Sequence, residues 1–378
     1  MSYQGRYSQK KPAKAQKPAS KGKKIVLILL LVLVLLIAAV VVAAVIYINS
    51  MLSLMTEPKD VSLPSMSDEE IEQMLNPSGA TASAEDPTVE TTIETSPEDT
   101  WPEIVSDENI TNILVVGQAA REGEEYRLSD SMILCTINRE TKTLTMTSFM
   151  RDMYVTIPAY AGHTQGANRI NVCYHLGSYW TGTTEGGMEM LELCIEKNFG
   201  IDVHHTIEVD FQVFQKIINL VGGVDVELSE AELEYMQCEG NNLELQVGMN
   251  HLDGVQALMY ARMRKIDSDY ERTGRQREIV TSIIENCRNL GLMELHSLFT
   301  EVLPMITTNM TNSEITNYAF EFLPMVKDLQ IVSQTCPIKG TYWGENIGTE
   351  DVPDYVLKFD TWANKKLLQE TCGAVEAE

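Results

Sequence analysis

Acidic residues are absent from the first 24 residues of this 378-residue chain, and residues 25–48 contain no charged side chain at all. The cations before residue 25 are Arg6, Lys10, Lys11, Lys14, Lys17, Lys21, Lys23 and Lys24. Because the whole chain nevertheless has a formal net charge of -25, its excess of acids lies after residue 48. That part of the chain lacks the broad basic face that phosphate backbones require, so we expect no nucleic-acid partner.

The uncharged run of residues 25–48 consists almost entirely of Ile, Leu, Val and Ala. As a helix rising ~1.5 Å per residue, it would be long enough to cross the roughly 30 Å of hydrocarbon in a bilayer. A buried core helix is rarely apolar on all sides over this length, and a cleaved signal peptide would have a shorter apolar core. We therefore expect one uncleaved transmembrane helix at residues 25–48.

The basic residues before this span predict its orientation, because Lys and Arg stay on the cytoplasmic side of a membrane. We expect residues 1–24 to form a cytoplasmic tail that also meets anionic membrane lipid. The rest of the chain is then extracellular, and the protein is a single-pass protein of the cell membrane.

Residues 49–107 precede the first alternating strands and helices, and large apolar residues are scarce in their central part, residues 76–102, where Ser, Thr, Pro, Glu and Ala dominate. Such a composition cannot bury a core, so we expect a flexible acidic linker with a reach on the order of 40 Å. From residue 108 the pattern changes to alternating strands and helices. We predict an α/β domain at 108–340, with a mixed central β-sheet covered by helices. Residues 341–378 would be a C-terminal extension that packs on this domain or follows it.

Hydrophobic periodicity and turn residues place the main elements of this domain. Strands are predicted at 112–117, 131–138, 143–148 and 224–228, and helices at 187–199, 211–221, 253–260 and 273–290. Residues 139–142 are typical of a hairpin turn. Gly222-Gly223 would end the predicted helix at 211–221. Residues 261–265 are predicted to be extended.

Cysteine motifs are also lacking, since the seven cysteines form no CxxC and no zinc-like spacing. Cys135, Cys173 and Cys194 lie in apolar runs and are expected to be core residues. Cys336 and Cys372 flank the C-terminal segment and either pair or remain free. Histidine forms no HExxH pattern and serine no nucleophile elbow, which argues against a zinc or serine hydrolase.

Arginine is absent after Arg288, and five arginines fall within sixteen residues. These five are Arg262, Arg264, Arg272, Arg275 and Arg277. Arg262 and Arg264 are two apart on a predicted extended segment, so their side chains would leave the same face. Arg272 and Gln276 are four apart at the start of a helix and would share a face near its free N–H groups.

Guanidinium forks suit bidentate phosphate binding, and a helix N-terminus also favours anions. The four residues Arg262, Arg264, Arg272 and Gln276 are therefore predicted to form a pyrophosphate cradle. The alternative is a solvated face in which these arginines pair with nearby acids. Those acids are Asp267, Asp269, Glu271 and Glu278.

Several longer stretches carry a specific resemblance. They are NILVVGQAAREGEEYRLSDSMIL, TLTMTSFMRDMYVTIPAY, NRINVCYHLG, IEVDFQVFQKIINLVGGVDVEL, VGMNHLDGVQALMYARMRK and SDYERTGRQREIV. In this order and over residues 113–280, the chain resembles the LytR–CpsA–Psr family of cell-wall glycopolymer transferases. The resemblance implies an α/β/α domain in a Gram-positive-type envelope. It also implies transfer of a teichoic-acid-like or capsular glycan from a polyprenyl-pyrophosphate carrier to peptidoglycan.

The resemblance also implies roles for individual residues. Those that would hold the pyrophosphate are Arg127, Arg151, Arg169, Asn171, Arg262, Arg264, Arg272 and Gln276. Arg151, Arg262, Arg264, Arg272 and Asp130 would be catalytic, by stabilising charge on the transferred and leaving phosphates. Asp152 and Asp269 match acidic positions that would orient an arginine or accept the proton of the acceptor hydroxyl.

Asp130 matches a metal ligand of the family, and Mg²⁺ is the expected cofactor. The family commonly reads Gly-x-Asp where this chain has Gly117-Gln118-Ala119, so the usual second ligand is replaced by Ala119. Mg²⁺ binds through one or two carboxylates together with phosphate oxygens and waters. We therefore expect Mg²⁺ to bind weakly or only with substrate.

Two alternatives to the transferase remain open at this point. One is a lipid-pyrophosphate pyrophosphatase, which would use water in place of the sugar hydroxyl. The other is a non-catalytic wall protein that binds or senses a lipid pyrophosphate, which the replacement at Ala119 would favour.

The charge asymmetry generates a topology prediction. Protease added to intact protoplasts should digest the chain beyond about residue 50 and spare the basic tail, because cations stay inside. Immunodetection of an N-terminal tag measures this. Protection of the acidic part would contradict the predicted orientation.

Overall fold

The computed structural model describes residues 50, 104–118, 128–240, 244–264, 266–349 and 353–376. The fold reported below belongs to the unit Met51–Glu378, which is separate from Met1–Ser50. The predicted tail, the apolar span, most of the linker, Ala119 and Arg127 lie outside the described residues. Within the described part of the chain, no helix has the length and apolar character needed to cross a bilayer.

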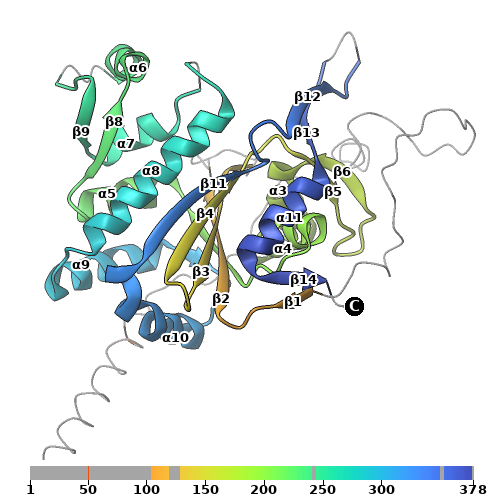
Figure 1. Ribbon diagram of the computed structural model, residues 1–378, viewed down its shortest axis with the longest axis horizontal. Helices are drawn as coiled ribbons and strands as arrows, with labels where there is room; N and C mark the ends of the chain where they lie inside the picture. Colours follow the sequence, from red (N-terminus) through yellow and green to blue (C-terminus); the bar gives the residue numbers. More distant parts are fainter. Residues whose placement is uncertain are drawn as a thin grey trace, which may run out of the picture. The chain divides into compact units, whose positions relative to one another are not determined.

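A mixed sheet forms the middle layer of the described fold (Figure 1). Its strands lie in the order β10 (Thr307–Thr308), β7 (His205–Val209), β2 (Ile110–Gln118), β3 (Ser129–Asn138), β4 (Thr143–Phe149) and β11 (Gln330–Cys336). β3 is antiparallel to both of its neighbours, β2 and β4, whereas β7 is parallel to β2 and β11 is parallel to β4. The mixed sheet confirms the predicted fold class.

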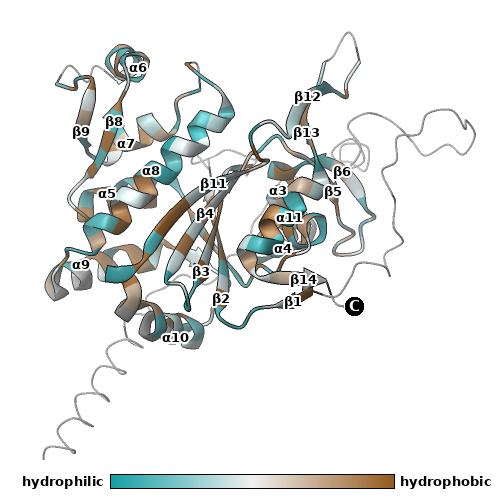
Figure 2. Ribbon diagram, viewed as in Figure 1, coloured by the Kyte–Doolittle hydropathy of each residue, from teal (hydrophilic) through white to brown (hydrophobic). Residues whose placement is uncertain are grey.

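Side chains alternate along the central strands, so each strand serves two layers. On β3, Met132 and Leu134 join the core on one face, whereas Ile133 joins the core on the other. Both faces of the sheet are apolar, because helices cover both of them. Figure 2 shows hydrophobic residues along the central strands. The covering helices also need close approach: a Cβ on Gly177 would lie 2.1 Å from the carbonyl oxygen of Gly186.

Two helical layers cover the sheet. One layer contains η2 (Ile170–Val172), α3 (Cys173–Thr181), α4 (Thr184–Phe199) and α11 (Thr361–Cys372). The other contains α5 (Phe211–Leu220), α7 (Gly254–Ala261) and α8 (Asp269–Cys287). On this second face α8 packs Val280 and Ile284 against Ile133, Leu144 and Met146.

Smaller elements extend these layers. The two-stranded pairs are β1 (Ile104–Ser106) with β14 (Ala374–Glu376), β5 (Tyr154–Ile157) with β6 (Gly166–Arg169), β8 (Val224–Leu228) with β9 (Gly248–Leu252), and β12 (Tyr342–Asn346) with β13 (Tyr355–Phe359). The other helices are α6 (Glu230–Gly240), α9 (Leu292–Val302), η3 (Leu303–Met305), α10 (Asn312–Phe322) and η4 (Leu323–Asp328). The C-terminal helix α11 contributes Leu368 and Cys372 to the main core.

Most predicted elements are confirmed, and the differences have local causes. The strand predicted at 261–265 is wrong: α7 continues to Ala261, and Arg262 caps it by donating its N–H to the carbonyls of Met259 and Tyr260. The helix predicted from residue 273 begins one turn earlier, at Asp269. All seven cysteines are free, so Cys336 and Cys372 do not pair.

Burial of one carboxyl generates a pH prediction. Glu192 on α4 accepts hydrogen bonds from Thr206 Oγ1 at 2.6 Å and Asn309 Nδ2 at 2.9 Å. Burial raises the pKa of Glu192 from 4.5 to about 7, although these two hydrogen bonds act in the opposite direction. Because the folded chain binds this proton more tightly than the unfolded chain, Glu192 lowers stability as the pH rises from 4.5 to 7.

Glu192→Gln keeps an oxygen acceptor for both donors but carries no titratable proton. Between about pH 5 and pH 8, the variant should therefore lose roughly 2–3 kcal/mol less unfolding free energy than the natural chain. Urea denaturation at the two pH values measures the difference. Parallel losses in the two proteins would show that Glu192 does not titrate in this window.

Candidate functional site: an apolar cavity that opens onto an arginine cluster

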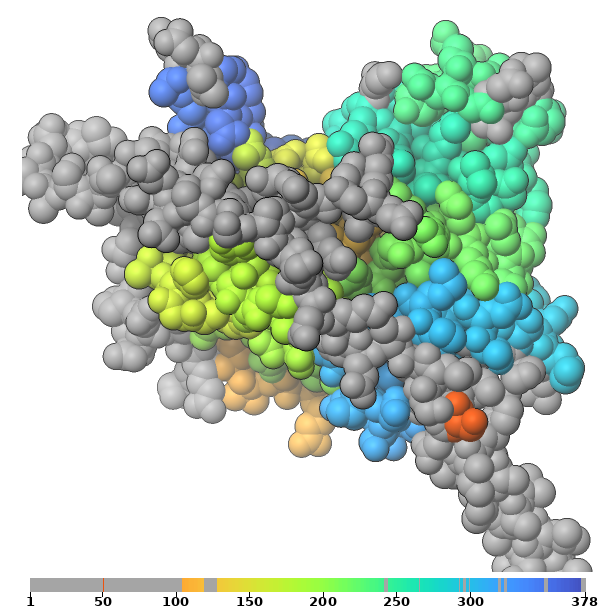
Figure 3. Space-filling view, turned by 180° about the vertical axis from the view of Figure 1, so that it is seen from behind, coloured from red at the N-terminus to blue at the C-terminus, as the bar shows by residue number. Residues whose placement is uncertain are grey.

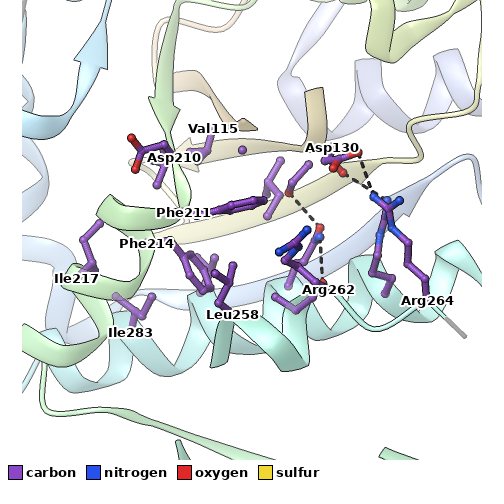
Figure 4. Close-up of a pocket in the computed structure, with 18 residues that line it drawn as sticks. Val115, Asp130, Asp210, Phe211, Phe214, Ile217, Leu258, Arg262, Arg264 and Ile283 are labelled. Carbon is purple, nitrogen blue, oxygen red and sulfur yellow. Dashed lines mark hydrogen bonds and ion pairs between the residues drawn. The ribbon is translucent and has the colours of Figure 1, made fainter. Parts of the chain in front are cut away.

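A cavity of about 220 Å³ lies between the sheet and the helices α5, α7 and α8. Its deeper wall is apolar: Val115 and Ile133 come from the sheet, Phe214 from α5, Leu258 from α7 and Ile283 from α8. In Figure 4 the labelled apolar side chains gather at one end, and Asp130 and Arg264 lie at the other. The cavity therefore has an apolar interior and a charged mouth.

The mouth is built by the four residues predicted as a cradle, together with Asp130. Arg262, Arg264, Arg272 and Gln276 all line it. Gln276 accepts a hydrogen bond from Ser131 Oγ at 3.0 Å, which ties α8 to β3. The predicted geometry of Arg262 and Arg264 was wrong, but their predicted proximity to Arg272 and Gln276 is confirmed.

Arg262 and Arg264 differ in their surroundings. The Arg262 guanidinium lies over the Phe211 ring, with its Cζ 4.4 Å from the ring centroid. Arg264 Nη2 lies 3.1 Å from Asp130 Oδ1, and the Arg264 side chain is 49% exposed. Both guanidiniums therefore stand where an anion at the mouth can reach them.

Arg151 lies at the centre of the charged cluster. It follows β4, and its Nη1 is 3.1 Å from Asp130 Oδ1. Its Nε is 3.5 Å from Asp152 Oδ2 and 3.9 Å from Asp269 Oδ1. Burial by itself would lower the pKa of Arg151, but the charges of Asp152, Asp269 and Asp130 outweigh it and raise the pKa. Arg151 is thus a permanent cation held by three carboxylates.

Arg272 comes from the first turns of α8 and is almost fully buried, with 3% of its side chain exposed. Its Nη2 lies 2.6 Å from Asp269 Oδ1 and donates to the Asp130 carbonyl at 3.3 Å. Its Nε has no hydrogen-bond partner among the described residues. Burial lowers the pKa of Arg272 and raises the pKa of Asp269, although each group opposes the shift of the other.

Arg169 extends the cluster away from the cavity. Its Nε lies 3.7 Å from Asp152 Oδ1, and its Nη2 pairs with Asp354 and donates to the Tyr355 carbonyl at 2.7 Å. Asn171 lies behind Arg151, since its N–H donates to the Arg151 carbonyl at 3.3 Å. The Asn171 side chain is buried, and its Oδ1 lacks a partner among the described residues.

Two arginines of the dense cluster lie elsewhere. Arg275 is buried and pairs with Asp267 and Glu232. Its Nη2 donates to the Met263 carbonyl at 2.9 Å. Its guanidinium therefore does not line the cavity. Arg277 is buried in α8, and burial lowers its pKa. The pairing raised from the sequence as an alternative is therefore found for Arg275 with Asp267 and for Arg272 with Asp269, although both arginines are buried and not on a solvated face. It does not describe Arg262 or Arg264.

Sequence reasoning missed two contributors to the site. Phe211 supplies the ring beneath Arg262, and its position at the first residue of α5 gave it the pattern of a core residue. Asp354 pairs with Arg169 from the C-terminal segment, where no motif marked it. Arg127 lies outside the described residues, so its predicted role stays a prediction.

Metal ligands are few at this site. Among the described residues, no group of three or more His, Cys, Asp or Glu side chains could hold a metal ion. Asp130, the predicted ligand, already has one carboxylate oxygen 3.1 Å from both Arg151 and Arg264. Two adjacent guanidiniums oppose the approach of a further cation, so these residues by themselves do not fit a protein-held Mg²⁺.

A comparison with protein families agrees with the motif order. The model of the LytR_cpsA_psr family matches residues 74–356. The chain belongs to the LytR–CpsA–Psr family. This confirms the resemblance carried by the motifs in residues 113–280.

The chain is similar to two curated relatives of this family. It is 34% identical over 191 residues to the polyisoprenyl-teichoic acid–peptidoglycan teichoic acid transferase TagU of Oceanobacillus iheyensis, covering 50% of this chain and 55% of that protein. It is 33% identical over 186 residues to the corresponding transferase TagT of Bacillus subtilis, covering 48% of this chain and 53% of that protein. The chain therefore matches about half the length of these relatives.

A solved structure described as "TagT bound to LIIa-WTA" shares the fold. It superposes with a TM-score of 0.55 at 25% sequence identity, and the alignment covers 70% of this chain and 92% of that chain. The α/β/α layers around a mixed sheet are therefore those of LytR–CpsA–Psr proteins.

The contrast between Arg264 and Arg275 generates a paired prediction. Arg275→Ala leaves Asp267 and Glu232 without their buried partner, so it should lower unfolding free energy by roughly 3–5 kcal/mol. Arg264→Ala removes an exposed side chain and should cost less than about 1 kcal/mol of stability. Farnesyl pyrophosphate, a short polyprenyl pyrophosphate, probes the predicted pyrophosphate cradle. The same Arg264→Ala variant should weaken its binding by roughly 1.5–3 kcal/mol. Thermal melts and calorimetric titration measure the two effects, and the reverse pattern would assign Arg264 a structural role.

Proposed function

We propose that this chain transfers a glycopolymer from a polyprenyl-pyrophosphate carrier to peptidoglycan. One observation carries the proposal: an apolar cavity opens directly onto a cluster of guanidinium groups. A polyprenyl pyrophosphate has the same two-part chemistry, with an apolar chain joined to a dianionic or trianionic head. The names of the relatives TagU and TagT, both polyisoprenyl-teichoic acid–peptidoglycan teichoic acid transferases, support the same reaction.

In this proposal the cavity takes the first isoprenoid units between the sheet and α5, α7 and α8. Burial of apolar surface contributes about 25 cal/mol per Å² to such binding. The pyrophosphate then lies at the mouth, within reach of Arg262, Arg264 and Arg272, with Arg151 beside it. Gln276 supplies an amide near the first turn of α8, whose free N–H groups also favour an anion.

The reaction is a phosphoryl transfer to a sugar hydroxyl. The acceptor oxygen attacks the phosphorus nearer the glycan, a new P–O bond forms, and the bond to the bridging oxygen breaks. The polyprenyl monophosphate leaves with that electron pair, and the hydroxyl proton passes to a carboxylate. Catalysis of this kind consists mainly of positioning and charge stabilisation. The arginines at the mouth provide both.

Asp152 and Asp269 are the carboxylates available for the proton. Both contact Arg151, and Asp269 also contacts Arg272. Burial raises the pKa of Asp269, so this carboxylate binds a proton more readily than an ordinary exposed carboxylate does. We assign proton acceptance to Asp269 and the orientation of Arg151 and Arg169 to Asp152.

The Arg–Asp pairs hold the guanidiniums of the site in place. Asp130, Asp152 and Asp269 neutralise Arg151, Arg264 and Arg272. A bound pyrophosphate would take over part of this neutralising charge, and its oxygens would accept hydrogen bonds from the guanidiniums. The arginines are therefore already in place when the substrate arrives, and little reorganisation is required.

Mg²⁺ belongs to this proposal only as an ion that enters with the donor. Asp130 is the carboxylate nearest to the mouth that would meet it, and phosphate oxygens would complete its ligands. When bound, the ion would neutralise phosphate charge, and no step above depends on it. The proposed location of the domain is extracellular, anchored by residues 25–48, where peptidoglycan and membrane-bound donor are both present.

A transfer assay tests this function. The full chain in detergent, a short polyprenyl-pyrophosphate disaccharide and peptidoglycan oligomers should yield a phosphodiester-linked product detectable by mass spectrometry. Asp269→Asn should lower kcat by roughly 10²–10⁴-fold, since it removes the proton acceptor, and it should not weaken donor binding, since it also removes a negative charge beside the arginines. Arg139→Ala is the matched control, because this arginine pairs with Glu321 far from the cluster.

The alternatives give different results in the same assay. Release of the phosphorylated disaccharide into water, without coupling, would identify a pyrophosphatase. Donor binding without turnover, with or without added Mg²⁺, would leave only a lipid-pyrophosphate-binding protein. Either result contradicts the proposed transferase.

A further inference from the structure

A second hollow begins at the arginine pair that borders the apolar cavity. It has a volume of about 430 Å³, and it shares Leu258, Arg262 and Arg264 with that cavity. Its volume lies within the range of roughly 300–1,000 Å³ that is typical of small-molecule sites. We call this hollow the outer groove. Because both hollows end at the same two arginines, an anion bound there is a neighbour of both.

Helix α7 forms the floor of the outer groove. Val255, Met259 and Arg262 line it, and their spacing of four and three residues puts them on one face of the helix. Val255 is 59% exposed although its side chain is apolar. Gly254 lets the start of α7 approach α5 closely, since a Cβ there would lie 2.3 Å from the Gln215 carbonyl oxygen. The floor therefore runs from an exposed apolar side chain to a guanidinium.

Polar side chains form the walls of the outer groove. α6 contributes Tyr235 and Glu239, which are four residues apart and share a face, and α5 contributes Gln215. Figure 3 shows this part of the molecule, where green residues of α5 and α6 lie beside teal residues of α7 and α8. Neither the Gln215 amide nor the Tyr235 hydroxyl has a hydrogen-bond partner among the described residues. The walls therefore offer an amide, a hydroxyl and a carboxylate to a ligand.

Arg264 connects the outer groove to the charged cluster. Its Nη2 lies 3.1 Å from Asp130 Oδ1, and Arg151 Nη1 lies 3.1 Å from the same oxygen. A phosphate bound between Arg151 and Arg264 would therefore stand at the end of the outer groove.

The outer groove also lies where a third substituent of the reacting phosphorus can go. The attacking and leaving oxygens lie roughly in line with phosphorus, so the oxygen of the glycan leaves at an angle to that line. Leu258, one turn before Arg262, lines both hollows, so the outer groove runs beside the apolar cavity on the other side of α7. A glycan in the outer groove therefore blocks neither the lipid nor the attacking hydroxyl.

The chemistry of the outer groove fits a sugar ring, which has apolar C–H faces and hydroxyl groups along its edge. Val255 and Met259 supply apolar surface, and the Gln215 amide and the Glu239 carboxylate supply hydrogen-bonding groups. A few polar groups on a largely apolar lining are typical of small-molecule sites. A lipid bilayer is a poorer fit, because this amide and this carboxylate would lose hydration without gaining partners.

We propose that the outer groove binds the first sugars of the donor glycan while the prenyl chain occupies the apolar cavity. The inference rests on the proposed transfer reaction and adds to it the surface that recognises the glycan. Hydroxyl groups of the sugar donate to Glu239 and accept from the Gln215 amide, and an apolar face of the ring lies on Val255.

The test compares two ligands of the full chain in detergent: farnesyl pyrophosphate, and farnesyl pyrophosphate that carries an N-acetylglucosamine disaccharide. Gln215→Ala and Glu239→Ala should each weaken binding of the disaccharide ligand by roughly 3- to 10-fold, the usual effect of losing one hydrogen bond. Neither variant should weaken binding of farnesyl pyrophosphate. Gln212→Ala and Glu234→Ala are the matched controls, because these exposed residues belong to the same two helices and do not line the groove. Calorimetric titration measures each affinity.

The outcomes separate this inference from the proposed function. If binding of the disaccharide ligand depends on Gln215 and Glu239 but no transfer occurs, the glycan subsite stands and the transferase proposal fails. If transfer occurs and both variants bind the disaccharide ligand as tightly as the natural chain does, the subsite is overturned and the transferase stands. Equal losses for the two ligands, or equal effects of the control variants, also overturn the subsite. Binding to anionic vesicles that depends on the same two residues, in place of binding to the disaccharide, overturns it as well.

Discussion

Arg151 connects three carboxylates that come from distant parts of the sequence, and the site depends on this arrangement. Asp130 belongs to β3, Asp152 follows Arg151 directly, and Asp269 begins α8. A buried guanidinium is stable only when such partners compensate for lost hydration. The same contacts therefore fix the end of the sheet against the start of α8 and hold a cation where a phosphate is expected.

Helices cover both faces of the sheet, and the residues on the two sides of the charged cluster around Arg151 therefore differ. On the side of α5, α7 and α8, the packing leaves an apolar cavity that ends at the arginines. On the other side, Arg169 and Asp354 join the centre to the β12–β13 hairpin. The charged centre therefore has an apolar surface on one side and a polar one on the other. This separation follows from the fold and not from any single motif.

Much of the fold was predictable because its elements have strong local signals. The turn at 139–142 joins β3 and β4 as predicted, with Lys142 in the left-handed region at φ 52°. The error at residues 261–265 arose because alternating arginines resemble a strand, whereas a strand also needs a partner, and none lies beside Arg262. The sequence placed Arg264 in the predicted cradle and left Arg275 outside it, but it did not show that Arg275 is buried against acids, because only packing distinguishes a buried pair from an exposed one.

The sequence by itself determined the family, the α/β class and the set of arginines, since motif order, periodicity and residue type are local properties of the chain. Only the tertiary structure decided which cations face the cavity, that Phe211 lies beneath Arg262, and that Asp354 joins the cluster. Asp354 pairs with a residue 185 positions earlier in the chain. Contacts over such separations depend on how the layers pack, and packing is a property of the whole core that no local pattern records.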